Sequence, residues 1–192
     1  MRLCVFCGSS FGARAVYREA AEEFGGLLAR RGIELVYGGA HAGLMGALAD
    51  AVLAGGGQVI GVIPEALVGR ELAHSGLTDL RIVGSMHERK ALMASLSDGF
   101  VALPGGIGTF EELFEIWTWA QLGYHAKPVG LLNVAGFYDG LLSFAATMGE
   151  VGFLRPQHQG LLIASDDLDD LLAKMAAFVP GPTIVQMKAE EL

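Results

Sequence analysis

The sequence predicts an α/β fold, in which a parallel β-sheet is covered by helices on both of its faces. Short apolar segments of strand length alternate along the chain with amphipathic segments of helical length. Several of the apolar segments lack the polar alternation of a strand that has one solvated face. We therefore expect a doubly wound parallel sheet whose strands are buried on both sides.

Glycine and proline residues divide the first half of the chain into its expected elements. A short apolar run ended by a glycine turn or by Pro64 predicts each strand, and an amphipathic run stopped by glycine predicts each helix. The expected order is a strand at residues 2–7, a helix at 15–30, a strand at 33–37, a helix at 44–53, a strand at 58–63, an irregular or briefly helical segment at 65–76 and a strand at 79–83.

The second half of the chain continues the alternation. Its clearest helix carries apolar residues at the i, i+3, i+4, i+7 spacing of one helical face, namely Phe110, Leu113, Phe114 and Trp117. The expected order is a helix at 86–96, a strand at 99–103, a helix at 109–121, a strand at 128–132, a helix at 138–148, a strand at 161–164 and a helix at 166–178. We expect one Rossmann-like domain over residues 1–180 and a fraying tail at 181–192.

The composition favours a globular protein with a sizeable core. The chain has 192 residues, of which 52% are apolar and 18% charged, a balance too apolar for disorder. The net charge of −8 argues against a nucleic-acid partner. No apolar run approaches the ~20 residues that span a bilayer, and the first residues do not resemble a signal peptide. We therefore expect a cytoplasmic protein without a membrane partner.

The cysteines and histidines do not show the spacing of a metal site. Cys4 and Cys7 have C-x-x-C spacing, but in a strand they would point to opposite faces, so we expect small buried hydrophobes and no disulfide. The five histidines lack a spacing such as H-x-x-x-H. We expect no metal.

Three glycine turns follow expected strands, at Gly8-Ser9-Ser10, Gly38-Gly39 and Gly105-Gly106. Because the carboxyl ends of parallel strands meet at one edge of the sheet, we expect these turns to lie together at a ligand site. None of them has the G-x-G-x-x-G pattern, which favours a ligand of mononucleotide size over NAD. The turn at Gly105 leads into a helix, whose free N–H groups and dipole favour a phosphate or carboxylate.

Arg89 and Glu112 are the charged residues that the pattern singles out. Arg89 lies in the middle of the apolar stripe of its helix and near the helix start, where a cation meets the helix dipole unfavourably. A snorkelling arginine, an arginine paired with a structural carboxylate and a functional cation are the open interpretations. Glu112 follows Thr109 at capping-box spacing, so a helix cap is the better interpretation from spacing alone. The same residue also faces away from the apolar stripe of its helix, at the ligand edge.

The segment Pro104–Glu112 resembles the Pro-Gly-Gly-x-Gly-Thr-x-x-Glu signature of the LOG family, the cytokinin riboside monophosphate phosphoribohydrolases, which are often mislabelled lysine decarboxylases. Further blocks with the same resemblance are Cys7-Gly8-Ser9-Ser10, Tyr37-Gly38-Gly39, Gly43-Leu44-Met45-Gly46, Met86-His87-Glu88-Arg89-Lys90 and Thr118-Trp119-Ala120-Gln121-Leu122-Gly123. Ala40 departs from the pattern, because many relatives carry glycine there.

The resemblance implies hydrolysis of the N-glycosidic bond of a nucleoside 5'-monophosphate, such as a cytokinin ribotide or AMP, without a cofactor. It implies that Arg89 and Glu112 are catalytic. The expected substrate-binding residues are Gly8, Ser9, Gly39, Glu71, Lys90, Gly105, Gly106, Ile107, Gly108, Thr109, Glu111 and Thr118. For three of these a simpler interpretation stands beside the functional one: Glu71 and Glu111 as solvated charges, and Thr118 as a surface hydroxyl.

The resemblance also implies a homodimer with sites near the interface. The high apolar content supports this, as do Ile116 and Trp119, which lie off the main stripe of the helix at 109–121. A non-catalytic carrier of a phosphate-bearing ligand such as the molybdenum cofactor is the alternative function, since such carriers share the general fold. A structural or regulatory module is a third hypothesis, and the ligand-edge glycine turns argue against it.

Overall fold

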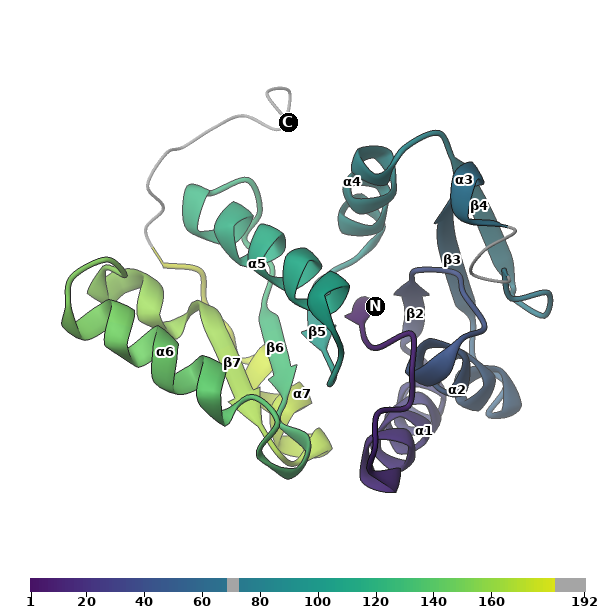
Figure 1. Cartoon of the computed structure of the whole chain (residues 1–192), viewed down its shortest axis with the longest axis horizontal. Helices are drawn as coiled ribbons and strands as arrows, with labels where there is room; N and C mark the ends of the chain where they lie inside the picture. The colour runs from purple at the N-terminus through teal and green to yellow at the C-terminus, as the bar shows by residue number, and fades with distance from the viewer. Residues whose placement is uncertain (69–72, 182–192) are drawn as a thin grey trace.

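The computed structural model describes residues 1–68 and 73–181, and it shows a seven-stranded sheet with helices on both sides (Figure 1). The strands are β1 (Arg2–Phe6), β2 (Glu34–Tyr37), β3 (Val59–Pro64), β4 (Asp79–Val83), β5 (Gly99–Ala102), β6 (Val129–Leu132) and β7 (Leu162–Ser165). The α-helices are α1 (Ala15–Arg30), α2 (Gly43–Ala54), α3 (Glu65–Val68), α4 (Met86–Leu96), α5 (Ile107–Leu122), α6 (Asp139–Glu150) and α7 (Leu168–Ala176). Two short 3-10 helices, η1 (Val134–Gly136) and η2 (Pro156–Leu161), complete the described part.

The sheet is doubly wound, as the sequence predicts. Its strand order is β4-β3-β2-β1-β5-β6-β7, and every pair of neighbouring strands in it is parallel. The chain therefore moves outward from β1 to β4 and then returns to the other side of β1 to build β5, β6 and β7. The pair β1–β5 is the point at which the direction of winding reverses, and in such sheets ligands bind beyond the carboxyl ends of the strands at that point.

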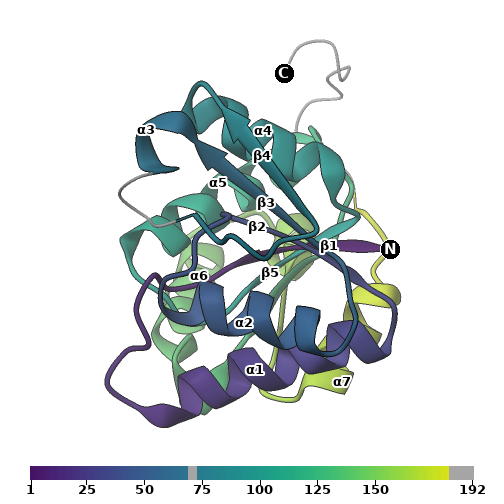
Figure 2. The ribbon, with the colours of Figure 1, turned by 90° about the vertical axis from the view of Figure 1, so that its right-hand side faces the viewer.

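Helices α1, α2 and α7 pack on one face of the sheet, while α4, α5 and α6 pack on the other. Figure 2 shows α1, α2 and α7 on the opposite side of the strands from α4 and α5. All six residues of β3 are buried, which explains why its sequence lacks polar alternation. Cys4 and Cys7 are free, buried and on opposite faces, each in a different core cluster, as predicted.

Within the described residues, the sequence locates all seven strands and six of the seven α-helices, with ends that differ by no more than two residues. The seventh helix, α3, lies at the start of the segment at 65–76 that was expected to be irregular or briefly helical, and residues 69–72 of that segment lie outside the described residues. Of the expected tail at 181–192, residue 181 is described and residues 182–192 lie outside the described residues. No described helix combines the length and the apolar character needed to cross a membrane.

The buried face of helix α5 overlaps the predicted one, since Leu113 and Trp117 are buried, but it is shifted from it. Phe114 is 38% exposed, whereas Ile116, which was expected to lie off the main stripe, is only 2% exposed and belongs to the core. The physical reason is that α5 contacts more than the sheet. Ile116 packs on the sheet in the same cluster as Leu113, and Trp117 packs with Leu154 and Leu161 from the segment around η2. These two contacts together turn the buried face away from Phe114.

His125 fixes the connection between α5 and β6. Its Nε2 atom donates a hydrogen bond to the Ile116 carbonyl (3.0 Å), its Nδ1 atom accepts one from the Lys127 amide (3.1 Å), and its ring lies 5.0 Å from the Phe100 ring. Burial lowers the pKa of His125 to about 4. The folded protein thus holds a neutral imidazole where the unfolded chain would carry one that protonates near pH 6.5.

This difference makes the protein less stable as the pH falls from about 6.5 toward 4, because the unfolded chain binds an additional proton over that range. We expect the free energy of unfolding to decline more steeply between pH 7 and pH 5 in the wild type than in His125→Gln, which cannot titrate. Urea unfolding at both pH values measures this. Equal declines in the two proteins would contradict the prediction.

Candidate active site

A cavity of about 200 Å³ lies at the reversal point of the sheet, beyond the carboxyl ends of β1, β2 and β5. Five segments distant in sequence line it, because parallel strands bring their following turns to one edge. The lining residues are Val5, Phe6, Cys7, Ser9, Gly38, Met45, Arg89, Gly106, Ile107, Gly108, Thr109 and Glu112. The glycine turns after β1, β2 and β5 therefore meet at one site, as the sequence predicts.

The start of α5 forms one wall of the cavity. Its N-cap is Gly106, no side chain caps it, and its first turn carries no acidic residue. The unpaired N–H groups and the positive end of the helix dipole are therefore open to an anion.

The capping-box interpretation of Thr109 and Glu112 is wrong, because the helix begins at Ile107, before Thr109. Thr109 is a buried residue of the first turn, and Glu112 lies in the second turn, too far along the helix to close a box. The helix begins directly after the glycine turn, so Gly106 and not Thr109 occupies the N-cap position.

The glycines of this turn have two different roles. A Cβ atom on Gly105 would lie 2.1 Å from the Thr109 Oγ1 atom, so packing within the protein requires glycine there. A Cβ atom on Gly106 or Gly108 would meet no atom within 4 Å. Packing within the protein therefore does not require glycine at these two positions. Both line the cavity, and a ligand that lies close to the backbone there would require the absence of a side chain.

Arg89 forms the opposite wall and is 5% exposed, so it does not snorkel to the solvent. Its Nη2 atom donates to the Gly38 carbonyl (3.1 Å), and a Cβ atom on Gly38 would lie 2.0 Å from that nitrogen. Its Nε atom is buried and has no hydrogen-bond partner in the part of the chain that the structure describes. A buried cation with an unused donor, beside a cavity, is suited to an anionic ligand.

Glu112 extends from the second turn of α5 into the same cavity, as expected for a residue that faces away from the core. Its charge also reaches Cys7: burial, and then the Glu112 carboxylate, raise the pKa of the Cys7 thiol. Cys7 is thus held as a neutral thiol, which suits a wall residue and not a nucleophile. The cavity therefore combines a helix N-terminus, a buried arginine and a carboxylate.

The other expected site residues that the structure describes, namely Gly8, Gly39, Lys90, Gly105, Glu111 and Thr118, lie outside the cavity lining. Gly8 supports the site by donating its amide to the Pro104 carbonyl (3.1 Å), which ties the first turn to the third. Gly39 is buried with a φ of 76°, and Thr118 is exposed on α5. Lys90 and Glu111 form an ion pair with each other. Glu71 lies outside the described residues.

Sequence reasoning missed several lining residues, chiefly Gly38 and Met45. Gly38 is the first residue of the second glycine turn, and its carbonyl accepts the hydrogen bond from Arg89 of α4. The sequence around Gly38 does not encode this contact, because Arg89 is distant in the chain. Met45 lies in the first turn of helix α2, which follows the second glycine turn. The block Gly43-Leu44-Met45-Gly46, which resembles the family, was the sequence signal that could have indicated Met45 as a site residue.

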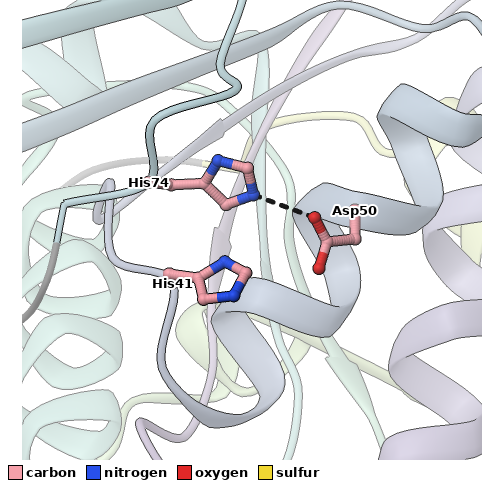
Figure 3. Close-up of side chains that lie close together, drawn as sticks. All are labelled: His41, Asp50 and His74. Atoms are coloured by element: carbon pink, nitrogen blue, oxygen red, sulfur yellow. Dashed lines mark hydrogen bonds and ion pairs between the residues drawn. The ribbon is translucent and has the colours of Figure 1, made fainter.

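The fold also gathers His41, Asp50 and His74, whose potential ligand atoms lie within 4.8 Å of one another (Figure 3). The His74 Nδ1 atom accepts a hydrogen bond from the Gly76 amide (3.0 Å), so its proton resides on Nε2, which faces Asp50 at 2.9 Å. A metal-ligating histidine instead presents an unprotonated nitrogen to the metal and donates from the other. The hydrogen bonds therefore fit a structural pair, in which His74 ties its loop to α2, better than a metal site.

The fold and the cavity define an α/β protein with a cavity suited to an anion at the reversal point of a doubly wound sheet. A family described as "Possible lysine decarboxylase" matches residues 45–175. The chain is 55% identical to the probable cytokinin riboside 5'-monophosphate phosphoribohydrolase LOGL9 of Oryza sativa subsp. japonica, over 93% of this chain and 79% of the relative. It is 50% identical to the cytokinin riboside 5'-monophosphate phosphoribohydrolase LOG1 of Arabidopsis thaliana, over 93% and 84%. The chain belongs to the LOG family.

Among solved structures, the molybdenum cofactor carrier protein of Chlamydomonas reinhardtii superimposes with a TM-score of 0.70 at 22% identity, covering 92% of this chain and 98% of the carrier. At that identity the likeness concerns the fold alone. It confirms the predicted fold class and leaves the chemistry to the residues of the cavity.

Proposed function

We propose that the protein hydrolyses the N-glycosidic bond of a nucleoside 5'-monophosphate, releasing a free base and ribose 5-phosphate. The substrate would be a cytokinin ribotide, as in the names of the relatives, or AMP. The observation that carries this proposal is that the α5 N-terminus, the buried Arg89 and the Glu112 carboxylate line one cavity. Its volume of about 200 Å³ suits the phosphoribosyl part of a mononucleotide better than a dinucleotide.

In this proposal the phosphate lies at the turn from Gly105 to Thr109, where the free N–H groups and the helix dipole neutralise its charge. The sugar then extends toward Glu112. Cleavage of the bond between the base and C1' builds positive charge on the ribose ring, as in other glycoside hydrolyses. The Glu112 carboxylate stabilises that charge and accepts a proton from the attacking water, whose oxygen forms the new bond to C1'.

Arg89 supplies the positive charge of the site. Its guanidinium is fixed by the Gly38 carbonyl and keeps an unused Nε donor, so it can bind the ribose phosphate or support the departing base. The base leaves with the electron pair of the broken bond and takes up a proton from solvent, and Glu112 returns the proton that it accepted from water to solvent, so the step balances. The sequence shows no nucleotide-cofactor fingerprint, and none of these steps requires a cofactor.

The reaction itself is the first test. Purified protein should release adenine from AMP, or the free base from a cytokinin ribotide, without added metal or NAD. Adenosine should be a poor substrate, because without the phosphate the binding energy at the α5 N-terminus is lost. Chromatography of the free base measures both. No base after long incubation at high enzyme concentration would refute the proposal and favour a carrier.

The second test concerns Glu112. Because Glu112 is not a helix cap, Glu112→Gln should leave the melting temperature nearly unchanged while removing the negative charge and the basicity of the side chain. We expect turnover to fall roughly a hundredfold or more, as for the loss of one positioned acid–base or electrostatic group. Melting curves and base-release rates on one preparation measure this. A stable variant with near-normal turnover would remove Glu112 from the mechanism.

The proposed assembly is a homodimer in which a second copy covers the groove between α4 and α5. This groove has a volume of about 450 Å³ and a mainly apolar lining that includes Ala91, Ala94, Trp119 and Tyr124. The apolar share of 52% in the whole chain fits a protein that covers such a surface with a partner. The cytoplasmic location expected from the sequence stays a prediction.

Light scattering at working concentration should therefore give the mass of a dimer. Ala91→Arg places a charge in the groove on an exposed position of α4, and we expect it to shift the protein toward monomer. Ala173→Arg, on an exposed position of α7, is the matched control and should remain a dimer. A wild-type monomer with full activity would contradict the proposal.

A further inference from the structure

The side chain of Tyr138 is fully buried at the N-cap position of α6, and it lies outside the lining of the cavity. Its hydroxyl donates a hydrogen bond to the Leu103 carbonyl (2.6 Å). Leu103 directly precedes the glycine turn from Pro104 to Thr109, which leads into α5. Burial raises the pKa of the Tyr138 hydroxyl above its ordinary value, so the hydroxyl remains a hydrogen-bond donor at neutral pH.

This hydrogen bond takes the Leu103 carbonyl out of the sheet. Strands β1 and β5 pair in parallel, and the Leu103 amide still donates to the Phe6 carbonyl (2.9 Å). If the ladder continued, the Leu103 carbonyl would accept a hydrogen bond from the Gly8 amide. Instead the Gly8 amide donates to the Pro104 carbonyl (3.1 Å), and Tyr138 donates to Leu103. The chain therefore leaves the ladder at Leu103, where Tyr138 holds it.

Tyr138 also contacts the far end of the glycine turn. Its ring lies edge-to-face on the Phe110 ring, with 5.8 Å between the ring centroids. Phe110 follows Thr109 on α5, and its amide donates to the carbonyl of the N-cap residue Gly106 (3.2 Å). One buried side chain thus touches the residue before the turn and the residue after it.

Tyr138 is itself fixed from the end of β6. Its amide donates to Asn133 Oδ1 (2.7 Å), and Asn133 Nδ2 donates to Asp139 Oδ1 (2.7 Å). The connection between β6 and α6 passes through left-handed conformations at Ala135 and Gly136, with φ values of 51° and 75°. Such a conformation is costly for alanine and persists only where the surrounding contacts impose it. The backbone that carries Tyr138 is therefore held in one conformation.

We infer that Tyr138 is a positioning residue, which orients the N–H groups of the glycine turn toward the phosphate of the ligand and does not touch the ligand. The inference rests on the proposed function, since it concerns the phosphate end of the same cavity. Backbone N–H groups bind a phosphate only when several of them point at it together, so the path of the turn decides the affinity.

The effect of Tyr138 is confined to that end of the cavity. Beyond its first turn, α5 is held in the core by Leu113 and Ile116, which pack against the sheet independently of the Tyr138 hydroxyl. Loss of the hydroxyl should therefore displace the glycine turn and leave Glu112 in place. A substrate that carries a phosphate should be affected more than one without it.

The test is Tyr138→Phe, which removes the hydroxyl and keeps the ring on Phe110. Base release from AMP and from adenosine is measured at high enzyme concentration. We expect kcat/KM for AMP to fall roughly tenfold, while that for adenosine changes less than about twofold because adenosine does not use the turn. Asn133→Ala, which releases Tyr138 from β6, should lower the preference for AMP in the same direction.

Tyr37→Phe is the matched control. Tyr37 is as fully buried as Tyr138, and its hydroxyl has no hydrogen-bond partner among the residues that the structure describes, so its loss should leave the preference for AMP unchanged. Equal losses for AMP and adenosine in Tyr138→Phe would indicate a merely structural role and overturn the inference, as would an unchanged preference. Melting curves identify a variant that fails to fold. If Tyr138→Phe fails, Asn133→Ala decides by the same criteria.

A wild type that releases no base refutes the proposed function, and the inference is then tested by calorimetric titration of ribose 5-phosphate. We expect Tyr138→Phe to bind this ligand roughly tenfold more weakly than the wild type, and Tyr37→Phe to bind it equally well. Equal affinities in Tyr138→Phe and the wild type would refute the inference alone. A wild type that does not bind ribose 5-phosphate would refute the inference together with the function.

Discussion

The pairing of β1 with β5 is the constraint on which the rest of the site depends. These strands are far apart in the sequence, and their parallel register aligns Phe6 with Ala102 at the edge of the sheet. The turn after β1 therefore meets the turn after β5, and the Gly8 amide donates to the Pro104 carbonyl. Because the winding reverses at this pair, no crossover helix covers the edge there, and the cavity is left open.

Two electrostatic features of the cavity reinforce each other. The α5 N-terminus has no side-chain cap and no acidic residue in its first turn, and the Arg89 guanidinium is buried with an unused donor. The buried arginine by itself is costly for the folded protein, since its charge is desolvated and its Nε donor is unsatisfied. An anion bound between them, as in the proposed function, would lower this cost and would also interact with the positive end of the α5 dipole.

The comparison with carriers of the molybdenum cofactor separates the fold from its chemistry. The sheet recurs at 22% identity, which shows a shared fold, and in folds of this class ligands bind at a site beyond the carboxyl ends of the strands. What the architecture does not supply is a carboxylate facing that site. Glu112 supplies it here because it lies in the second turn of α5 and lines the cavity.

Local patterns in the sequence determined the order of strands and helices, the class of the sheet and the meeting of the three glycine turns. The reason is that apolar periodicity and glycine punctuation are properties of neighbouring residues, and parallel winding then follows from the alternation. The same patterns indicated Arg89, because a charged residue inside an apolar stripe is visible without a structure.

Only the tertiary structure decided which residues meet across elements. The capping box failed because the glycine turn brought the start of α5 to Ile107. Ile116 became a core residue because of the sheet and core cluster it packs against, and Trp117 found partners near η2. Lys90 reached Glu111 and Glu115, and His74 reached Asp50, through the packing of helices and loops that are separate in sequence. Such contacts depend on distances between elements, and the spacing of residues within one element carries no information about them.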